Sequence, residues 1–467
     1  MKSRLFLLLV FMGSFGALLA GGGSPSNFKR APMLKQRLHL EFSVVDFPQN
    51  FLPNGHFPSM RQSLQMSNNF YELGYWGIES LRDVIIQNRE TRFRRILHRG
   101  LGYALSLPFV RWGSDLPIPL GTWAHEEFHR SVLGLQGLPS YNGNWLLRRW
   151  DGTVFGTSDA ELQAMKSNDL PNLLHAYTAG IEAQNAISRT NALHDFFTDR
   201  TIHKNALYLY NAWYVWNYFR GSCGPASDAV KGFAPDFLPE DQRQRDFAGL
   251  DLTAWAYDMT EPNADYLSRD TLPGLTGVNR YVGFSDLQSG AQKFLVRQRN
   301  LSLLNFLQPA IFFKNRFELG PSLRATFMVQ YAPTPFGNSI SLTVPFTLKA
   351  NRNYFVGLHT YNNNSKHFPG LELGIYKWPV AANQKLSLTA SLQGWMQPKG
   401  QDFFATESEL GGGVAVRGDY SFHRMLSAFA GLQAKTNGWQ LANPYLGSNL
   451  SADAGIAMHL WSSRYAW

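Results

Sequence analysis

The most chemically specific stretch of the chain is a His-Glu-x-x-His sequence formed by His125, Glu126 and His129. No proline or glycine interrupts residues 122–133, so a helix is predicted here. On a helix the two histidines lie one turn apart on the same face, and both imidazoles can bind one metal ion. Glu126 follows the first histidine, where a carboxylate can take a proton from metal-bound water without acting as a ligand.

This pattern resembles the zinc-dependent metallopeptidases called zincins. Thr122 matches their preference for Val or Thr three positions before the first histidine. Glu127 and Arg130 depart from the family, which favours uncharged residues at both positions. The resemblance implies one zinc ion, a polypeptide substrate and Glu126 as the general base. The charged residues at these two positions argue against peptidase activity more than against metal binding.

A third protein ligand is expected from a second helix. Residues 173–185 resemble the second metal-binding helix of a gluzincin, where a glutamate completes the site, so the resemblance implies Glu182 as the third zinc ligand. His175 lies seven residues earlier on the same face, where it fits an alternative ligand, a neighbour of the ligands or a catalytic group that stabilises the oxyanion. The sequence leaves Glu182 and His175 open as third ligand. Three small residues would let two helix backbones approach closely: Ala179, Gly180 and Ala183.

A mainly helical domain is expected over residues 59–305, where apolar residues recur at helical spacing. Proline-rich loops are expected between residues 225 and 273. The predicted helices lie near residues 61–83, 91–107, 120–133, 171–190, 203–220, 246–258 and 285–304.

The N-terminus predicts export from the cytoplasm. Lys2 and Arg4 precede an apolar run that ends at Ala20, which is typical of a signal peptide over residues 1–20. Residues 21–58 then form an N-terminal segment. The single cysteine, Cys223, cannot form an internal disulfide.

Composition excludes several classes of protein. The chain has 467 residues, a net charge of +9 and 14% aromatic residues. No internal segment approaches twenty apolar residues, which excludes an ordinary helical membrane protein. No surface that combines aromatic and basic residues for nucleic acid is predicted. Arginines cluster between residues 89 and 99, which suits a solvated helix face or contacts with anionic headgroups.

From about residue 306 to 467 apolar and polar residues alternate, which predicts half-buried antiparallel strands. Eight strands are expected after residue 322. Residues 38–45 and 311–319 also alternate and would raise the count to ten. The face opposite the apolar side chains carries a charged set that can pair across a polar lumen: Arg324, Glu372, Lys385, Glu409, Arg417 and Asp453.

Three features favour a transmembrane barrel in the outer membrane of a Gram-negative bacterium. They are the charged inner face, an expected alternation of long and short connections, and the terminal Trp467 on an alternating strand. Outer-membrane lipid and the barrel-assembly machinery are then expected partners. Eight strands would place the helical domain in the periplasm, which the sequence favours, and ten would place it on the cell surface.

The sequence thus predicts an α + β protein with a helical zincin-like domain and a C-terminal transmembrane barrel. The predicted function is a membrane-anchored zinc peptidase that hydrolyses envelope proteins. The alternative is a non-catalytic interaction or assembly protein whose His-Glu-x-x-His site is structural or degenerate.

Overall fold

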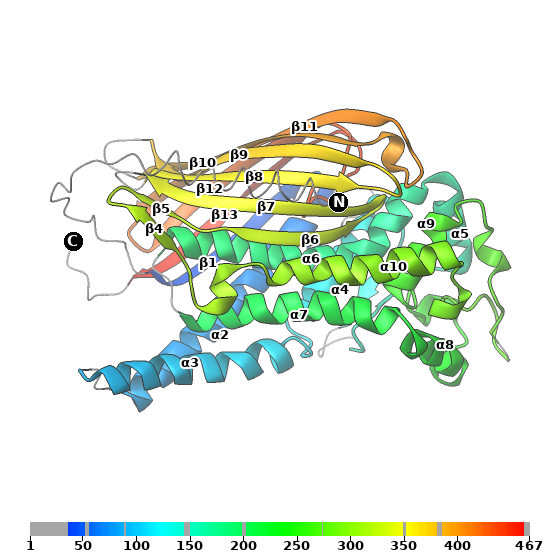
Figure 1. Cartoon of the computed structure of the whole chain (residues 1–467), viewed down its shortest axis with the longest axis horizontal. Helices are drawn as coiled ribbons and strands as arrows, with labels where there is room; N and C mark the ends of the chain where they lie inside the picture. Colours follow the sequence, from blue (N-terminus) through cyan, green and yellow to red (C-terminus); the bar gives the residue numbers. More distant parts are fainter. Residues whose placement is uncertain are drawn as a thin grey trace, which may run out of the picture.

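The computed structural model describes residues 36–51, 56–87, 90–143, 150–198, 202–272, 274–348, 352–380 and 385–461. The expected signal peptide and the terminal Trp467 lie outside the described residues. A large curved sheet covers one side of a layer of helices (Figure 1). The chain is therefore α + β, with a helical part followed by a large antiparallel sheet.

The helical part contains the helices predicted from the sequence and two that were not. The α-helices are α2 (Met60–Ile85), α3 (Arg92–Gly113), α4 (Gly121–Leu135), α5 (Asp159–Asn168), α6 (Leu170–Phe197), α7 (Asn205–Ser222), α8 (Pro225–Phe237), α9 (Asp251–Thr260) and α10 (Ser289–Ser302). Short 3-10 turns connect them, including η6 (Leu303–Phe306) and η7 (Pro309–Phe312). None of the described helices is long and apolar enough to cross a membrane.

The two helices missed from the sequence, α5 and α8, both have local causes. Ser158 caps α5 and forms a reciprocal capping box with Glu161. Pro225 occupies the first turn of α8, where a backbone N–H is not needed. The expectation of proline-rich loops was therefore wrong for residues 225–237.

The sheet has eleven strands, and two of them lie end to end beside the same neighbouring strand. The strands are β1 (Gln36–Phe47), β4 (Phe317–Gly320), β5 (Leu323–Ala325), β6 (Met328–Thr334), β7 (Gly337–Leu348), β8 (Arg352–Asn362), β9 (His367–Pro379), β10 (Leu386–Pro398), β11 (Ser408–His423), β12 (Leu426–Lys435) and β13 (Asn449–Trp461). Their order is β1-β13-β12-β11-β10-β9-β8-β7-β5-β4, and β5 and β6 pair with successive parts of β7. The predicted N-terminal strand is confirmed, since β1 pairs with β13, and the count of eight was too small.

The alternation of long and short connections is weaker than predicted. Only Pro335 and Phe336 separate β6 from β7, where a longer loop was expected. Gly337 makes this tight turn feasible, because its φ of 140° lies in a region that L side chains rarely adopt.

The two faces of the sheet differ as the alternation predicted. On β9, Leu373 is 47% exposed on the convex face, whereas Glu372 is 6% exposed on the concave face. Helices pack against the concave face, and a cavity of about 380 Å³ remains between α2, α6 and the strands. Arg189 of α6 pairs with Glu372 at 2.5 Å, and Arg61 of α2 pairs with Asp453 of β13 at 2.5 Å. The polar face thus anchors the helical part.

Asparagine side chains pair with the outer edges of two strands, β1 and β6. The Asn69 amide of α2 accepts from the Glu41 N–H of β1 at 2.8 Å and donates to the Glu41 carbonyl at 2.6 Å. Asn305 of η6 accepts from the Tyr331 N–H of β6 at 2.7 Å and donates to its carbonyl at 3.3 Å. Among the described strands the pairing runs from β1 to β4 without joining the two ends. Each amide therefore replaces a neighbouring strand, which protects these edges from pairing with another chain.

Replacing Asn305 by alanine should lower the free energy of unfolding by roughly 1–3 kcal/mol, because the buried backbone groups of Tyr331 lose their partner. Exposed Asn300 on α10 supplies the matched control, and Asn300→Ala should stay within about 0.5 kcal/mol of wild type. Urea unfolding measures both variants. Equal stability of the two would show that Asn305 does not seal the edge.

Candidate metal centre

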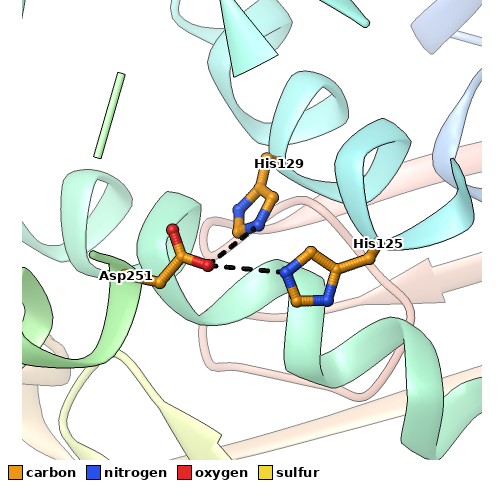
Figure 2. Close-up of side chains that lie close together, drawn as sticks. All are labelled: His125, His129 and Asp251. Atoms are coloured by element: carbon orange, nitrogen blue, oxygen red, sulfur yellow. Dashed lines mark hydrogen bonds and ion pairs between the residues drawn. The ribbon is translucent and has the colours of Figure 1, made fainter. Parts of the chain in front are cut away.

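Two histidines of α4 and one aspartate of α9 meet in a buried site. Figure 2 shows the His125 and His129 rings pointing at Asp251. Their Nε2 atoms lie 3.4 Å and 3.5 Å from the same carboxylate oxygen, Oδ2. His125 and His129 are each 1% exposed, and Asp251 is 6% exposed. Within the part of the chain that the structure describes, this is the one group of three or more His, Cys, Asp or Glu side chains close enough together to hold a metal ion.

Gly180 lets the α6 backbone pass directly against the two imidazoles. A Cβ at this position would fall far inside van der Waals contact with the Nε2 atoms of both His125 and His129. The predicted close approach of α4 and α6 is therefore confirmed. Gly180 lies next to the two Nε2 atoms that would bind a metal.

The tautomer of His129 suits a metal ligand. Its Nδ1 donates to the backbone carbonyl of Ala176 on α6 at 2.5 Å. With a metal bound, Nε2 would be the unprotonated nitrogen, and it faces Asp251. Without an ion, burial lowers the pKa of His129 but the charge of Asp251 outweighs it and raises that pKa, so Nε2 can carry a proton toward the carboxylate. A hydrogen bond from the other ring nitrogen to a carbonyl is the usual way in which a protein orients a metal-binding histidine. Two imidazole nitrogens and one carboxylate oxygen are donors that zinc accepts, and three protein ligands leave a fourth position for water or substrate.

The structure does not bring Glu182 and His175 into this group. Both are fully buried on α6, and His175 Nε2 lies 3.0 Å from Glu182 Oε2. The other Glu182 oxygen accepts from the backbone N–H of Ala442, in the connection between β12 and β13. The Glu182 carboxylate therefore ties α6 to the sheet, and Asp251 stands where the sequence suggested Glu182.

Sequence reasoning missed Asp251 because its proximity is purely tertiary. It lies 126 residues beyond His125, and its helix was predicted without a role. One signal was present: Asp251 and Asp258 are seven residues apart and share a face of α9. In the structure Asp251 faces the two histidines, and Asp258 binds Arg269.

Glu126 lies beside the ligands in a low-dielectric, acidic environment. It is 6% exposed. Burial raises its pKa well above the ordinary value, and the charges of Asp251 and Asp246 raise it further. Burial and Asp251 also raise the pKa of Asp246, to about 7. A bound divalent cation would act in the opposite direction and favour the ionised carboxylates.

The charged residues that depart from the zincin pattern neutralise each other. Arg130 Nη1 lies 2.7 Å and 2.6 Å from the two oxygens of Glu127. Asn142 of β2 (Tyr141–Asn142) donates to the same carboxylate at 3.1 Å, and Arg130 Nε donates to the Ser140 carbonyl at 3.2 Å. This ion pair joins α4 to the hairpin formed by β2 and β3 (Val154–Phe155), so the charges serve to place the motif helix.

Asp258 anchors the helix that supplies Asp251. Arg269 contacts both of its oxygens, at 2.7 Å and 2.8 Å, and Lys166 of α5 contacts it at 2.9 Å. The Tyr177 hydroxyl of α6 donates to it at 3.0 Å. The Asp258 side chain has no exposed surface in this network, which fixes α9 against α5 and α6.

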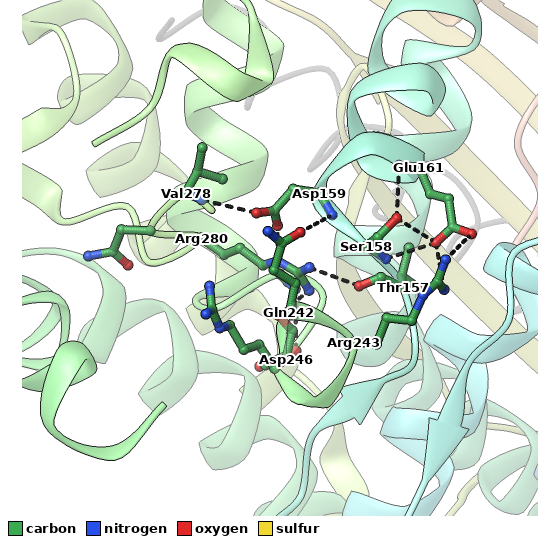
Figure 3. A network of polar contacts seen from close by, with 12 residues as sticks. Thr157, Ser158, Asp159, Glu161, Gln242, Arg243, Asp246, Val278 and Arg280 are labelled. Carbon is green, nitrogen blue, oxygen red and sulfur yellow. Dashed lines mark hydrogen bonds and ion pairs between the residues drawn. The ribbon is translucent and has the colours of Figure 1, made fainter. Parts of the chain in front are cut away.

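A second network holds the loop before α9 (Figure 3). Arg280 donates to Asp159 Oδ1 at 2.7 Å, to the Thr157 carbonyl at 2.8 Å and to the Asp246 carbonyl at 3.0 Å. Arg243 pairs with Glu161 at the start of α5. These contacts fix residues 243–246 shortly before Asp251, so its position results from packing over several helices.

Aromatic rings surround the histidines and exclude water. The Tyr218 hydroxyl of α7 donates to Asp251 Oδ2 at 2.6 Å, and the ring of Tyr218 lies 5.4 Å from that of His125. Tyr214 lies 5.9 Å from His125, and Phe247 lies 5.3 Å from His129. The aromatic segment of α7 thus packs against the α4 motif.

Comparison with known proteins finds no match among protein-family models, characterised proteins or solved structures.

Proposed function

We propose that this chain is a zinc-dependent peptidase held in the outer membrane of a Gram-negative bacterium. The observation that carries the proposal is the meeting of His125, His129 and Asp251 beside Glu126 in a dry site backed by Gly180. The proposed zinc ligands are the two histidines and Asp251. The resemblance of the motif to zincins supports a polypeptide substrate, such as another envelope protein.

The chemistry divides between the ion and the chain. Zinc, when bound, supplies a Lewis acid that polarises a peptide carbonyl and acidifies water. Glu126 accepts a proton from the attacking water and delivers it to the leaving amine, as a general base and then a general acid. Tyr218 holds Asp251 through its hydroxyl, and Ala176 holds His129 in the tautomer that presents Nε2. The aromatic side chains exclude bulk water, which strengthens each of these interactions.

The convex face of the sheet supports the membrane location. Its outward side chains are apolar and exposed, including Leu410 at 80%, Leu432 at 62% and Leu450 at 64%. An apolar exterior with a polar interior is the arrangement of outer-membrane sheets. Because α2 and α6 pair with the concave face, this location places the helical part within the curve of the sheet instead of free in the periplasm.

Metal stoichiometry tests the site. Wild-type protein loaded with zinc and freed of excess should retain about one ion per chain. His129→Ala and Asp251→Ala should each lose it, because two remaining ligands hold zinc weakly. Glu182→Ala, the matched control on α6, should retain the ion. Zinc lost from Glu182→Ala but retained in Asp251→Ala would overturn the ligand assignment, and wild type without zinc would overturn the proposed function.

One observation favours the alternative, a non-catalytic protein with a structural site. Asp251 already has three partners without an ion, namely Tyr218, His125 and His129. Such a group can act as a buried polar anchor between α4, α7 and α9. In that case chelators would leave the thermal unfolding temperature unchanged, whereas loss of a bound zinc lowers it.

A further inference from the structure

The helix α3 carries an apolar stripe that faces away from the rest of the protein. Its exposed positions recur at helical spacing along one face: Phe93, Ile96, Leu97, Gly100, Ala104 and Leu107. Phe93 is 71% exposed and Ile96 is 59% exposed. The opposite face holds the buried residues of this helix, among them His98, Ser106 and Val110. The stripe is therefore a surface without a partner among the described residues.

Arginines flank the apolar stripe at both ends. Arg92, Arg94 and Arg95 are exposed in the first turn of α3, Arg99 is exposed in its second turn beside the stripe, and Arg111 and Trp112 are exposed in its last turn. An apolar segment bounded by arginines and an aromatic ring matches the profile of a lipid bilayer, whose phosphates lie on either side of the acyl chains. The arrangement complements lipid in charge as well as in hydropathy.

The helix α3 lies on a side of the helical part that the sheet does not cover (Figure 1). In Figure 1, α3 lies on the side of the helical part opposite the sheet. The two end strands β1 and β4 do not pair with each other, so the sheet leaves one side of the helical part uncovered. Exposed apolar side chains also lie at the end of α2, which contacts α3, and at η7, where the Phe313 ring lies 5.1 Å from that of Tyr103 on α3: Leu81, Val84, Ile85, Phe312 and Phe313.

We propose that α3 faces the acyl chains of the bilayer and completes the lipid-facing wall between β1 and β4. This inference rests on the proposed membrane location and is independent of the metal site. The helix need not be apolar all round, because from His98 onward its other face packs on protein. The long Arg99 side chain would extend its charged end toward the phosphates on the Arg95 side. Arg92, Arg94 and Arg95 would bind lipid phosphates at one boundary of the bilayer, and Arg111 and Trp112 would lie toward the other.

Quenching by brominated lipid tests the proposal on the full chain. Single cysteines are introduced at Ile96 and Leu107 of the stripe in a Cys223→Ser background and labelled with an environment-sensitive fluorophore. Leu410 on the sheet is the control for lipid contact, and Glu407, whose side chain is 70% exposed, is the control for water. The protein is reconstituted in phosphatidylcholine and phosphatidylglycerol vesicles with or without bromine on the acyl chains.

We expect the labels at positions 96 and 107 to be quenched as strongly as the label at 410, with the label at 407 unaffected. Quenching at 410 without quenching at 96 and 107 would overturn the role of α3. Absence of quenching at all of these positions would overturn the membrane location, and the role of α3 with it. Neither result changes the zinc stoichiometry, so failure of this inference is distinguishable from failure of the metal site.

Discussion

Replacing Glu126 by glutamine should lower peptide hydrolysis by roughly 10²–10⁴-fold, the range typical of losing a general base. Glutamine keeps the size of the side chain but cannot take a proton from water. Because Glu126 is not among the proposed ligands, the variant should still bind about one zinc ion per chain. Fluorogenic peptide mixtures measure hydrolysis, and metal analysis of the same sample measures binding.

The matched control for this variant is Glu182→Gln. Glu182 is also a buried carboxylate facing the polar interior, but its oxygens bond His175 and the Ala442 N–H. Glutamine can accept from the same N–H, so hydrolysis by the zinc-loaded variant should match wild type. Unchanged hydrolysis in Glu126→Gln would remove Glu126 from the chemistry. Loss of zinc in that variant would instead make Glu126 part of the metal site.

The sheet was predictable because its signal is local. Alternation along a strand reports which side chains share a face, and both the strands and the polar concave face follow from it. What fills the concave face was not predictable. Glu372 and Asp453 were expected to pair across a lumen, but Arg189 and Arg61 reach them from helices. No local pattern encodes pairs that are 183 and 392 residues apart.

The same contrast holds for the metal site. The spacing of His125 and His129 is a property of one helix, and the structure keeps it. The third group depends on where α9 packs, which Arg280, Arg269 and Asp258 decide through contacts between distant segments. The small residues near Gly180 correctly predicted the close approach of α4 and α6. The structure does not bring the Glu182 carboxylate to the two histidines, because Glu182 points toward the sheet.

Gly180→Ala should abolish most zinc binding, because the added Cβ would occupy the space between His125 and His129. The contact is with two ligand rings held on α4, so neither ring can move without leaving its bond to Ala176 or its position facing Asp251. Outer-shell changes around metal sites commonly weaken binding by about 10–100-fold, and this change touches the ligands directly. Overpacking should also cost roughly 1–3 kcal/mol of stability. Competition with a chromophoric chelator measures the affinity.

Gly77→Ala separates this effect from a general response of helices to alanine. Gly77 is an exposed residue of α2, and a Cβ there would meet nothing within 4 Å. Alanine should stabilise that helix by roughly 0.5–1 kcal/mol and leave zinc affinity unchanged. Wild-type affinity in Gly180→Ala would mean that the histidines bind metal on a side away from α6. The same result would show that zinc binding does not need a small residue where α4 and α6 cross. Gly180 would then no longer support a metal site between these two helices.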